Sequence, residues 1–152
     1  MVQHLLQCGT DMEDVRRIEE FWESRVYMEK KILVLDADVK SCQEHVKVLA
    51  GRQYNTTSIH ILSDLEGYLE KGIYLAVILD IDSVPVDNRI IRELTIKYPE
   101  VHFLCTSKDR FHPDLKDAIC YHIYACLTKP VDPDEIFYLL RSIYEDDADS
   151  KK

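Results

Sequence analysis

Residues 77–85 read VILDIDSVP, an apolar run that stops on Asp80 and is followed by a second acid, Asp82, and by Pro85. Its first residues belong to the apolar segment LAVIL (75–79), which is typical of a strand buried on both faces of a sheet. The two acids could form a reactive site, or they could simply be the polar end of a strand that meets water. The neighbouring elements bear on this question, because parallel strands end at one edge of their sheet.

Further strands are predicted on both sides of this run. KILVLD (31–36) and VHFLC (101–105) are short apolar runs, ACLTK (125–129) is the last strand, and a weaker one rich in Thr and Ile covers 54–61. Between them, apolar residues at helical spacing predict helices over 39–49 and 88–98. A shorter helix is predicted over 63–72 from its end signals, and residues 113–121 can form another. A last helix is predicted to begin after Asp132, which caps it, with Pro133 at its first position.

Particular residues are predicted to begin or end these helices. Ser63 and Glu66 form a capping-box pattern, whereas Gly51, Gly72 and Pro99 end the helices that precede them. The result is five strand–helix units in strict alternation. Such alternation predicts an α/β fold, a doubly wound (βα)5 parallel sheet with helices on both faces.

Composition narrows the class of protein. The chain has 152 residues, 46% of them apolar, which suits one domain with a sizeable core. Its formal charge of −9 argues against nucleic acid or an anionic membrane as a partner. No apolar stretch approaches the roughly 20 residues that cross a bilayer, and the N-terminus lacks the order of a secretory signal. We therefore expect a cytoplasmic protein.

The five cysteines are odd in number and irregularly spaced, which favours reduced thiols. Cys120, His122 and Cys126 lie close together in the sequence, but no further ligand pair completes a tetrahedral set. We predict packing residues here and no zinc.

The strand ends carry the residues with chemistry. Asp36 and Asp38 end the first strand, Asp80 and Asp82 the third, Thr106 the fourth and Lys129 the fifth. Carboxylates beside a lysine suit Mg²⁺ and phosphoryl transfer, in which a carboxylate can act as nucleophile and the lysine offsets phosphoryl charge.

Four segments together resemble the receiver domains of bacterial two-component response regulators, over residues 29–146: KILVLDAD, VILDIDSVP, LCTS and LTKPVDPDEI. The resemblance implies a flavodoxin-like sheet of strand order 2-1-3-4-5. It implies Asp80 as the phosphoacceptor, Thr106 and Lys129 as residues that bind the phosphoryl group, and Asp36 as part of a Mg²⁺ site. It also implies a sensor histidine kinase or phosphotransfer protein and a downstream protein as partners, and no enzyme activity of its own.

The sequence departs from the family's pattern at several positions. Receivers have a second acid, a direct metal ligand, where this chain has Ala37, and an aromatic residue where it has Cys126. Pro85 comes five residues after Asp80 instead of four, so the loop between is expected to be remodelled. Two interpretations therefore stay open: an active receiver, and a receiver-like interaction module that is not phosphorylated.

Asp82 could compensate for the missing acid. An extended backbone would return its side chain to the side of Asp80, two residues earlier. We hypothesise that Asp82 joins Asp36 and Asp80 at a weakened Mg²⁺ site; otherwise it is an acid that faces solvent at the start of a loop.

One enzymatic alternative also fits part of the sequence. LDADV (35–39) also resembles the first motif of haloacid-dehalogenase-type phosphatases. The acidic motif expected after the lysine is absent, and there is no room for a cap domain. A flavin or nucleotide site is weaker still, because the loop DADVKS has no glycine for close phosphate approach.

The two ends lie outside the receiver-like part. In the extension 1–28, an apolar stripe over 11–28 predicts an extra helix that packs on its own domain or pairs with a second copy, although Met28 could be the true start. The tail 147–152 is charged, and a stand-alone protein is expected. The resemblance implies that partners bind the face formed by the last strand and its flanking helices, which would include Tyr121, Tyr124 and Phe137.

Overall fold

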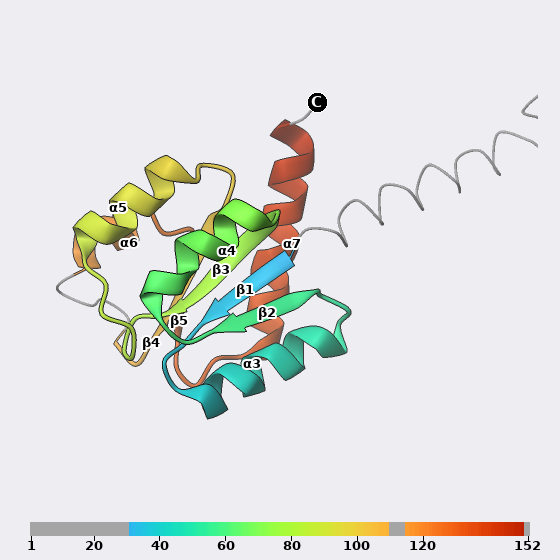
Figure 1. Ribbon diagram of the computed structural model, residues 1–152. Coiled ribbons are helices and arrows are strands. Elements are labelled where there is room, and N and C mark those ends of the chain that lie inside the picture. The colour runs from blue at the N-terminus through green and yellow to red at the C-terminus, as the bar shows by residue number, and fades with distance from the viewer. Residues whose placement is uncertain (1–30, 110–114, 151–152) are drawn as a thin grey trace, which may run out of the picture.

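The structure is a computed structural model that describes residues 31–109 and 115–150 (Figure 1). Strands and helices alternate along the chain, as the sequence predicts. The elements are β1 (Lys31–Leu35), α3 (Val39–Gly51), β2 (Thr56–Ile59), the short 3₁₀ helix η1 (Leu62–Asp64), α4 (Leu65–Lys71), β3 (Tyr74–Asp80), α5 (Asn88–Lys97), β4 (His102–Ser107), α6 (Lys116–Tyr121), β5 (Ala125–Thr128) and α7 (Pro133–Ser150).

The five strands form one parallel sheet of order β2-β1-β3-β4-β5. The predicted α/β fold class and strand order are therefore confirmed. β3 lies in the centre and is buried along its whole length, from Tyr74 to Asp80. Its apolar run has no alternation because helices cover both faces of the sheet.

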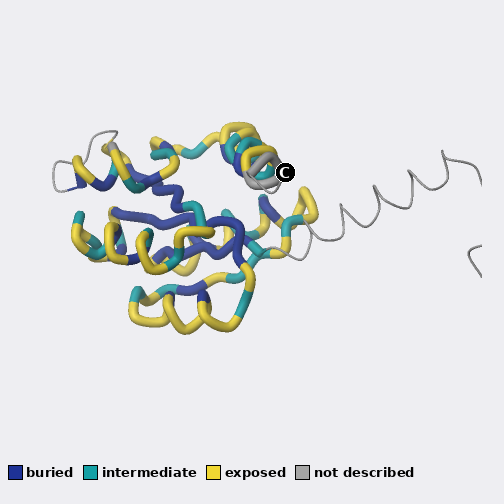
Figure 2. Tube along the Cα trace, turned by 90° about the horizontal axis from the view of Figure 1, so that it is seen from above, coloured by how far each residue is buried: buried dark blue, intermediate teal, exposed yellow. Residues whose placement is uncertain are grey.

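Two apolar clusters fill the space between sheet and helices. On one face, residues of α4, α5 and α6 such as Leu65, Ile91 and Ala118 pack on alternate strand residues. On the other face, α3 and α7 contribute Leu49 and Leu140. Figure 2 shows this layering, with the buried trace in the middle and the exposed helix surfaces outside. Leucine, isoleucine and valine dominate both clusters, so hydrophobic burial is the main stabilising term.

Some helix ends differ from the sequence-based expectation. The Ser63–Glu66 capping box is wrong: η1 occupies 62–64, and α4 begins at Leu65 without a side-chain cap. The prediction failed because the chain makes a tighter turn before α4 than the pattern assumes. The cap at Asp132 is confirmed, since its Oδ1 accepts a hydrogen bond from Asp134 N at 3.0 Å.

Other expectations lie outside the described residues. These are the helix predicted over 11–28, Met28 as a start, and the beginning of the helix predicted over 113–121. None of the helices in 31–109 and 115–150 combines the length and hydropathy needed to cross a bilayer.

Candidate functional site

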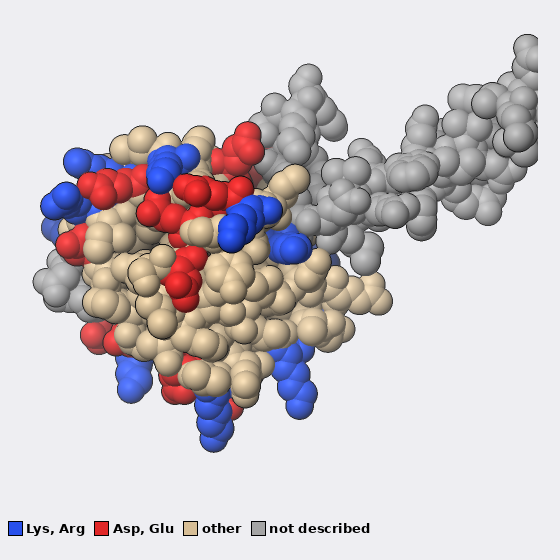
Figure 3. Space-filling model, viewed as in Figure 1, with Lys and Arg blue, Asp and Glu red and all other residues tan. Residues whose placement is uncertain are grey.

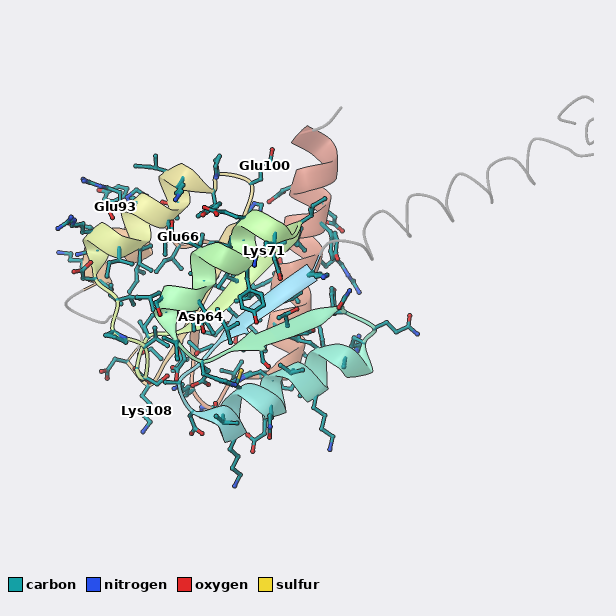
Figure 4. All side chains as sticks on the ribbon, viewed as in Figure 1. Asp64, Glu66, Lys71, Glu93, Glu100 and Lys108 are labelled. Carbon is teal, nitrogen blue, oxygen red and sulfur yellow. The ribbon has the colours of Figure 1, made fainter. Side chains whose placement is uncertain are left out.

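The candidate site lies at the carboxyl edge of the sheet, where the ends of β1, β3, β4 and β5 meet. Asp36 follows β1, Asp80 ends β3, Thr106 lies opposite Asp80 on β4, and Lys129 follows β5. Lys108, which follows β4, is labelled in Figure 4 and shows where this edge lies. The structure brings these four of the predicted residues to one edge, since parallel strands end on the same side.

Asp80 and Lys129 form the central ion pair. Lys129 Nζ lies 2.7 Å from Asp80 Oδ1, and the Thr106 hydroxyl donates to the same oxygen at 3.3 Å. The backbone N–H of Asp82 also donates to it, at 3.3 Å. Asp80 is only 4% exposed. A buried carboxylate needs such donors, because its desolvation is otherwise costly.

These contacts set the protonation of the pair. Burial alone would raise the pKa of Asp80, but hydrogen bonds from Lys129 and Ser83 and the charge of Lys129 outweigh it and hold this pKa below its usual value. Burial would lower the pKa of Lys129, whereas the hydrogen bonds to Asp80 and Asp82 raise it. At neutral pH the site therefore contains an ionised carboxylate beside an ammonium group.

Asp82 lies on the Lys129 side of the site. Its Oδ1 accepts a hydrogen bond from Ser107 Oγ at 2.8 Å, and its Oδ2 accepts one from Lys108 N at 2.8 Å and lies 3.1 Å from Lys129 Nζ. Burial would raise the pKa of Asp82, but these hydrogen bonds lower it. The expected extended backbone is wrong here, because the chain turns at 81–83 and Val84 N bonds to Asp80 O. The metal role predicted for Asp82 stays a prediction.

Ser83 is a site residue that the sequence analysis missed. Its hydroxyl oxygen lies 3.0 Å from Asp36 Oδ1 and 2.8 Å from Asp80 Oδ2, and it accepts a hydrogen bond from Ala37 N at 3.1 Å. A polar residue in the loop after a strand that ends in an acid was the available signal. Its direction depends on the turn at 81–83, which the sequence pattern did not reveal.

The acids that follow β1 have separate roles. Asp36 is 1% exposed, and its Oδ1 also accepts a hydrogen bond from Asp38 N at 2.9 Å. Asp38 caps α3, since its Oδ1 accepts from Lys40 N and Ser41 N. Its carboxylate is therefore engaged at the start of α3.

The oxygen donors at this edge are compatible with a hard cation such as Mg²⁺. Asp36 Oδ2 is buried, and no group in the described residues makes a hydrogen bond with it. Asp36 and Asp80 both reach Ser83, so two carboxylates and one hydroxyl converge. Within the described residues, however, no three His, Cys, Asp or Glu side chains are grouped to hold a metal ion. The donor set thus fits a weak site with few protein ligands.

Cys126 stands at the position where receiver domains have an aromatic residue. It lies opposite Cys105 on the neighbouring strand. A hydrogen bond between the two thiols raises the pKa of Cys105 and lowers that of Cys126. Of the other zinc candidates, the side chain of Cys120 is outside the described part, and His122 Nδ1 lies 3.4 Å from Thr95 Oγ1.

Comparison with known proteins identifies the fold that carries this site. The sequence matches no protein-family model and no curated protein. Among solved structures, the signal receiver domain of an HD domain-containing protein from Pseudomonas fluorescens Pf-5 is 22% identical, with a TM-score of 0.69 over 82% of this chain and 93% of that one. The chain has the fold of a response-regulator receiver domain.

Other receiver structures are similar to a comparable degree. Chemotaxis response regulator CheY4 of Vibrio cholerae is 15% identical, with a TM-score of 0.63 over 75% of this chain and 98% of that one. A CheY-like receiver domain protein from Methanospirillum hungatei JF-1 is 14% identical, with a TM-score of 0.68 over 80% and 98%. The likeness concerns the whole receiver fold and covers nearly all of each neighbour.

Proposed function

We propose that the protein is a receiver-type response regulator of two-component signal transduction, in which Asp80 accepts a phosphoryl group. The contact set of Asp80 carries this proposal. An ammonium group lies 2.7 Å from its Oδ1 and a hydroxyl 3.3 Å from the same atom, at the carboxyl edge of a receiver fold. A nucleophilic carboxylate with fixed donors beside it suits phosphoryl transfer.

The transfer uses groups of this chain. A carboxylate oxygen of Asp80 attacks the phosphorus of a phosphohistidine or of a small acyl phosphate; the new O–P bond forms as the donor's bond to phosphorus breaks. The donor keeps the electron pair, and Asp80 becomes an acyl phosphate. Lys129 and Thr106, which already contact Asp80, then turn to the phosphoryl oxygens and stabilise their charge. A divalent cation held by Asp36 and Asp80 would offset further negative charge there.

Output is proposed to pass through protein contacts. Tyr121 at the end of α6 and Tyr138 on α7 are 79% and 70% exposed, and Tyr124 lies beside α7, where its hydroxyl donates to Asp146. Exposed tyrosines are common at protein interfaces. Phe137, also expected on this face, is instead half-buried and stacks on Tyr54.

The remaining parts of the proposal concern partners and location. A sensor histidine kinase or a phosphotransfer protein would supply the phosphoryl group, and a downstream protein would bind the tyrosine-bearing face. Both partners fit a protein of the cytoplasm. A homodimer through residues 11–28 remains a proposal, because these residues lie outside the described part. We also propose that the protein acts as a stand-alone response regulator and has no enzyme activity of its own.

Phosphorylation can be tested directly. The full chain is incubated with acetyl phosphate and Mg²⁺, and its intact mass is measured. We expect addition of one phosphoryl group, its loss in Asp80→Asn, and its retention in Asp64→Asn, which alters a carboxylate on another part of the chain. Release of product from an aryl phosphate with continuous turnover would instead favour the phosphatase alternative.

A second candidate function is an interaction module that is never phosphorylated. Ala37 favours it, since this residue contributes only its backbone N–H to the site. No mass change with acetyl phosphate and no spectral shift at Thr106 with beryllofluoride and Mg²⁺, together with intact folding, would support this module and reject the first proposal.

A further inference from the structure

Ser83 occupies a singular position in the candidate site. It comes from the turn that follows β3, and its hydroxyl oxygen lies between two acids that belong to different strands' ends, Asp36 and Asp80. The same oxygen accepts the N–H of Ala37, the position at which receivers carry a further acid. Ser83 thus links the three chain positions around which a cation would be held.

The Ser83 hydroxyl has one hydrogen for its two contacts with carboxylate oxygens. A serine hydroxyl carries a single proton, so it can donate to only one carboxylate at a time. Its contacts to Asp36 Oδ1 and Asp80 Oδ2 are 3.0 and 2.8 Å, which are both hydrogen-bond distances between oxygens. One of these two contacts therefore brings oxygen lone pairs together with no hydrogen between them.

Two further observations indicate missing positive charge at the same place. Asp36 Oδ2 is buried, and it lacks a hydrogen-bond partner among residues 31–109 and 115–150. In the described part of the chain, the ion pairs of Asp80 and Asp82 both use the one ammonium group of Lys129. A buried carboxylate oxygen without a partner is costly, and a cation beside it would remove that cost.

We propose that Ser83 Oγ is the third oxygen donor of a divalent-cation site with Asp36 and Asp80. It would replace the acid that receivers have at the position of Ala37. Neighbouring ligands of octahedral Mg²⁺ lie about 2.9 Å apart, since each is 2.0–2.1 Å from the ion. The two separations at Ser83, 3.0 and 2.8 Å, match this spacing. A hydroxyl ligand is uncharged, so the site binds Mg²⁺ or Mn²⁺ less tightly than one with a further carboxylate.

This inference deepens the proposed function, because it names how the phosphoacceptor site would hold its cation. Its test does not involve phosphorylation. Mg²⁺ binding to the full chain is measured by calorimetry, and Mn²⁺ binding by electron paramagnetic resonance. We expect Ser83→Ala to weaken binding by about tenfold, the scale of losing one supporting group at a metal site. We expect Ala37→Asp to strengthen it.

The two substitutions combined give the sharpest result. With Ala37→Asp present, Ser83→Ala should change the affinity far less than it does in the natural sequence, because the new carboxylate replaces the hydroxyl. Tighter binding in Ser83→Ala alone would overturn the proposal, since Ser83 would then occupy the cation's place and exclude it. Unchanged binding would overturn it too, because Ser83 would then contribute no ligand. The same conclusion follows if only the Ala37→Asp protein binds either ion.

Asp82 needs a matched control, because its removal changes the charge near the site. Asp109→Asn removes a carboxylate from the same edge of the sheet and calibrates that effect. We expect Asp82→Asn to weaken binding no more than Asp109→Asn does. A loss with Asp82→Asn larger than that with Ser83→Ala would assign the third donor to Asp82 instead and overturn the proposal. Normal cation binding without phosphorylation would reject only the proposed function.

Discussion

Lys129 Nζ lies 2.7 Å from Asp80 Oδ1, and this ion pair joins the end of β5 to the end of β3 across β4. The lysine side chain is 23% exposed and the aspartate side chain 5% exposed, so the pair is largely shielded from solvent. Pairs of this kind matter less through their own attraction than through the charge that remains when one partner is lost.

Lys129→Met should therefore destabilise the protein by about 3 kcal/mol, because Asp80 would stay buried without its cation. The free energy of unfolding is measured by urea denaturation followed by circular dichroism. The double variant Lys129→Met/Asp80→Asn removes the uncompensated charge and should recover more than half of the loss. No recovery would mean that the lysine acts through packing of its carbon chain.

The contribution of this ion pair should depend on pH. The folded-state pKa of Asp80 and Asp82 is lowered, so the stability they contribute is present above the ordinary aspartate pKa of about 3.9 and is lost as the pH falls through the lower folded values. The folded-state pKa of Lys129 is raised, so its contribution is present below about 10.4 and is lost as the pH rises through the folded value.

The measurable result is a difference between two proteins. The gap in unfolding free energy between the natural sequence and Lys129→Met should stay level from about pH 5 to 9 and shrink below about pH 4. Urea denaturation across this range checks it. A gap that changes steadily between pH 6 and 8 would point to a histidine instead.

Thr106→Val should separate chemistry from stability. Thr106 is buried, and its hydroxyl donates to Asp80 Oδ1. Valine keeps the shape but removes the donor, which should cost about 1 kcal/mol of stability and slow phosphoryl transfer to Asp80. Thr106→Ser, which keeps the hydroxyl, is the control. Equal phosphorylation rates in the two variants would show that this hydroxyl takes no part in the transfer.

Asp87 offers a test of the scaffold away from the site. Its Oδ1 accepts a hydrogen bond from Ile90 N at 2.8 Å and caps α5. Asp87→Ala should lower the free energy of unfolding by about 1 kcal/mol, whereas Asp87→Asn should keep most of the cap. Thermal and urea denaturation of both variants measure this. The same loss in both would show that the side chain's charge matters more than the cap.

Surface ion pairs on the helices are expected to matter little by comparison. Lys97 of α5 contacts Glu66 and Glu70 of α4, at 2.9 and 3.7 Å. Figure 3 shows acidic and basic side chains interspersed over this part of the surface, and Figure 4 labels Glu66 beside α5. Such exposed pairs are screened by water and salt, so the fold depends chiefly on the two apolar clusters under the helices.

The sequence by itself determined the fold and most of the site's membership. Buried strands such as 75–79 are recognisable because their apolar runs are uninterrupted, and Asp36, Asp80, Thr106 and Lys129 were found because each follows or ends such a run. Their convergence follows from parallel topology alone, which places all strand ends at one edge. These features depend on local pattern and connection handedness, both of which the sequence carries.

Only the tertiary structure decided where the side chains beyond the strands point. The turn at 81–83 directs Asp82 to Lys129 and Ser107, and it brings Ser83 between Asp36 and Asp80. The two-residue alternation of a strand ends where the backbone leaves the sheet. After Asp80, side-chain direction depends on contacts with β1, β4 and β5, which are distant in sequence, and no local pattern encodes them.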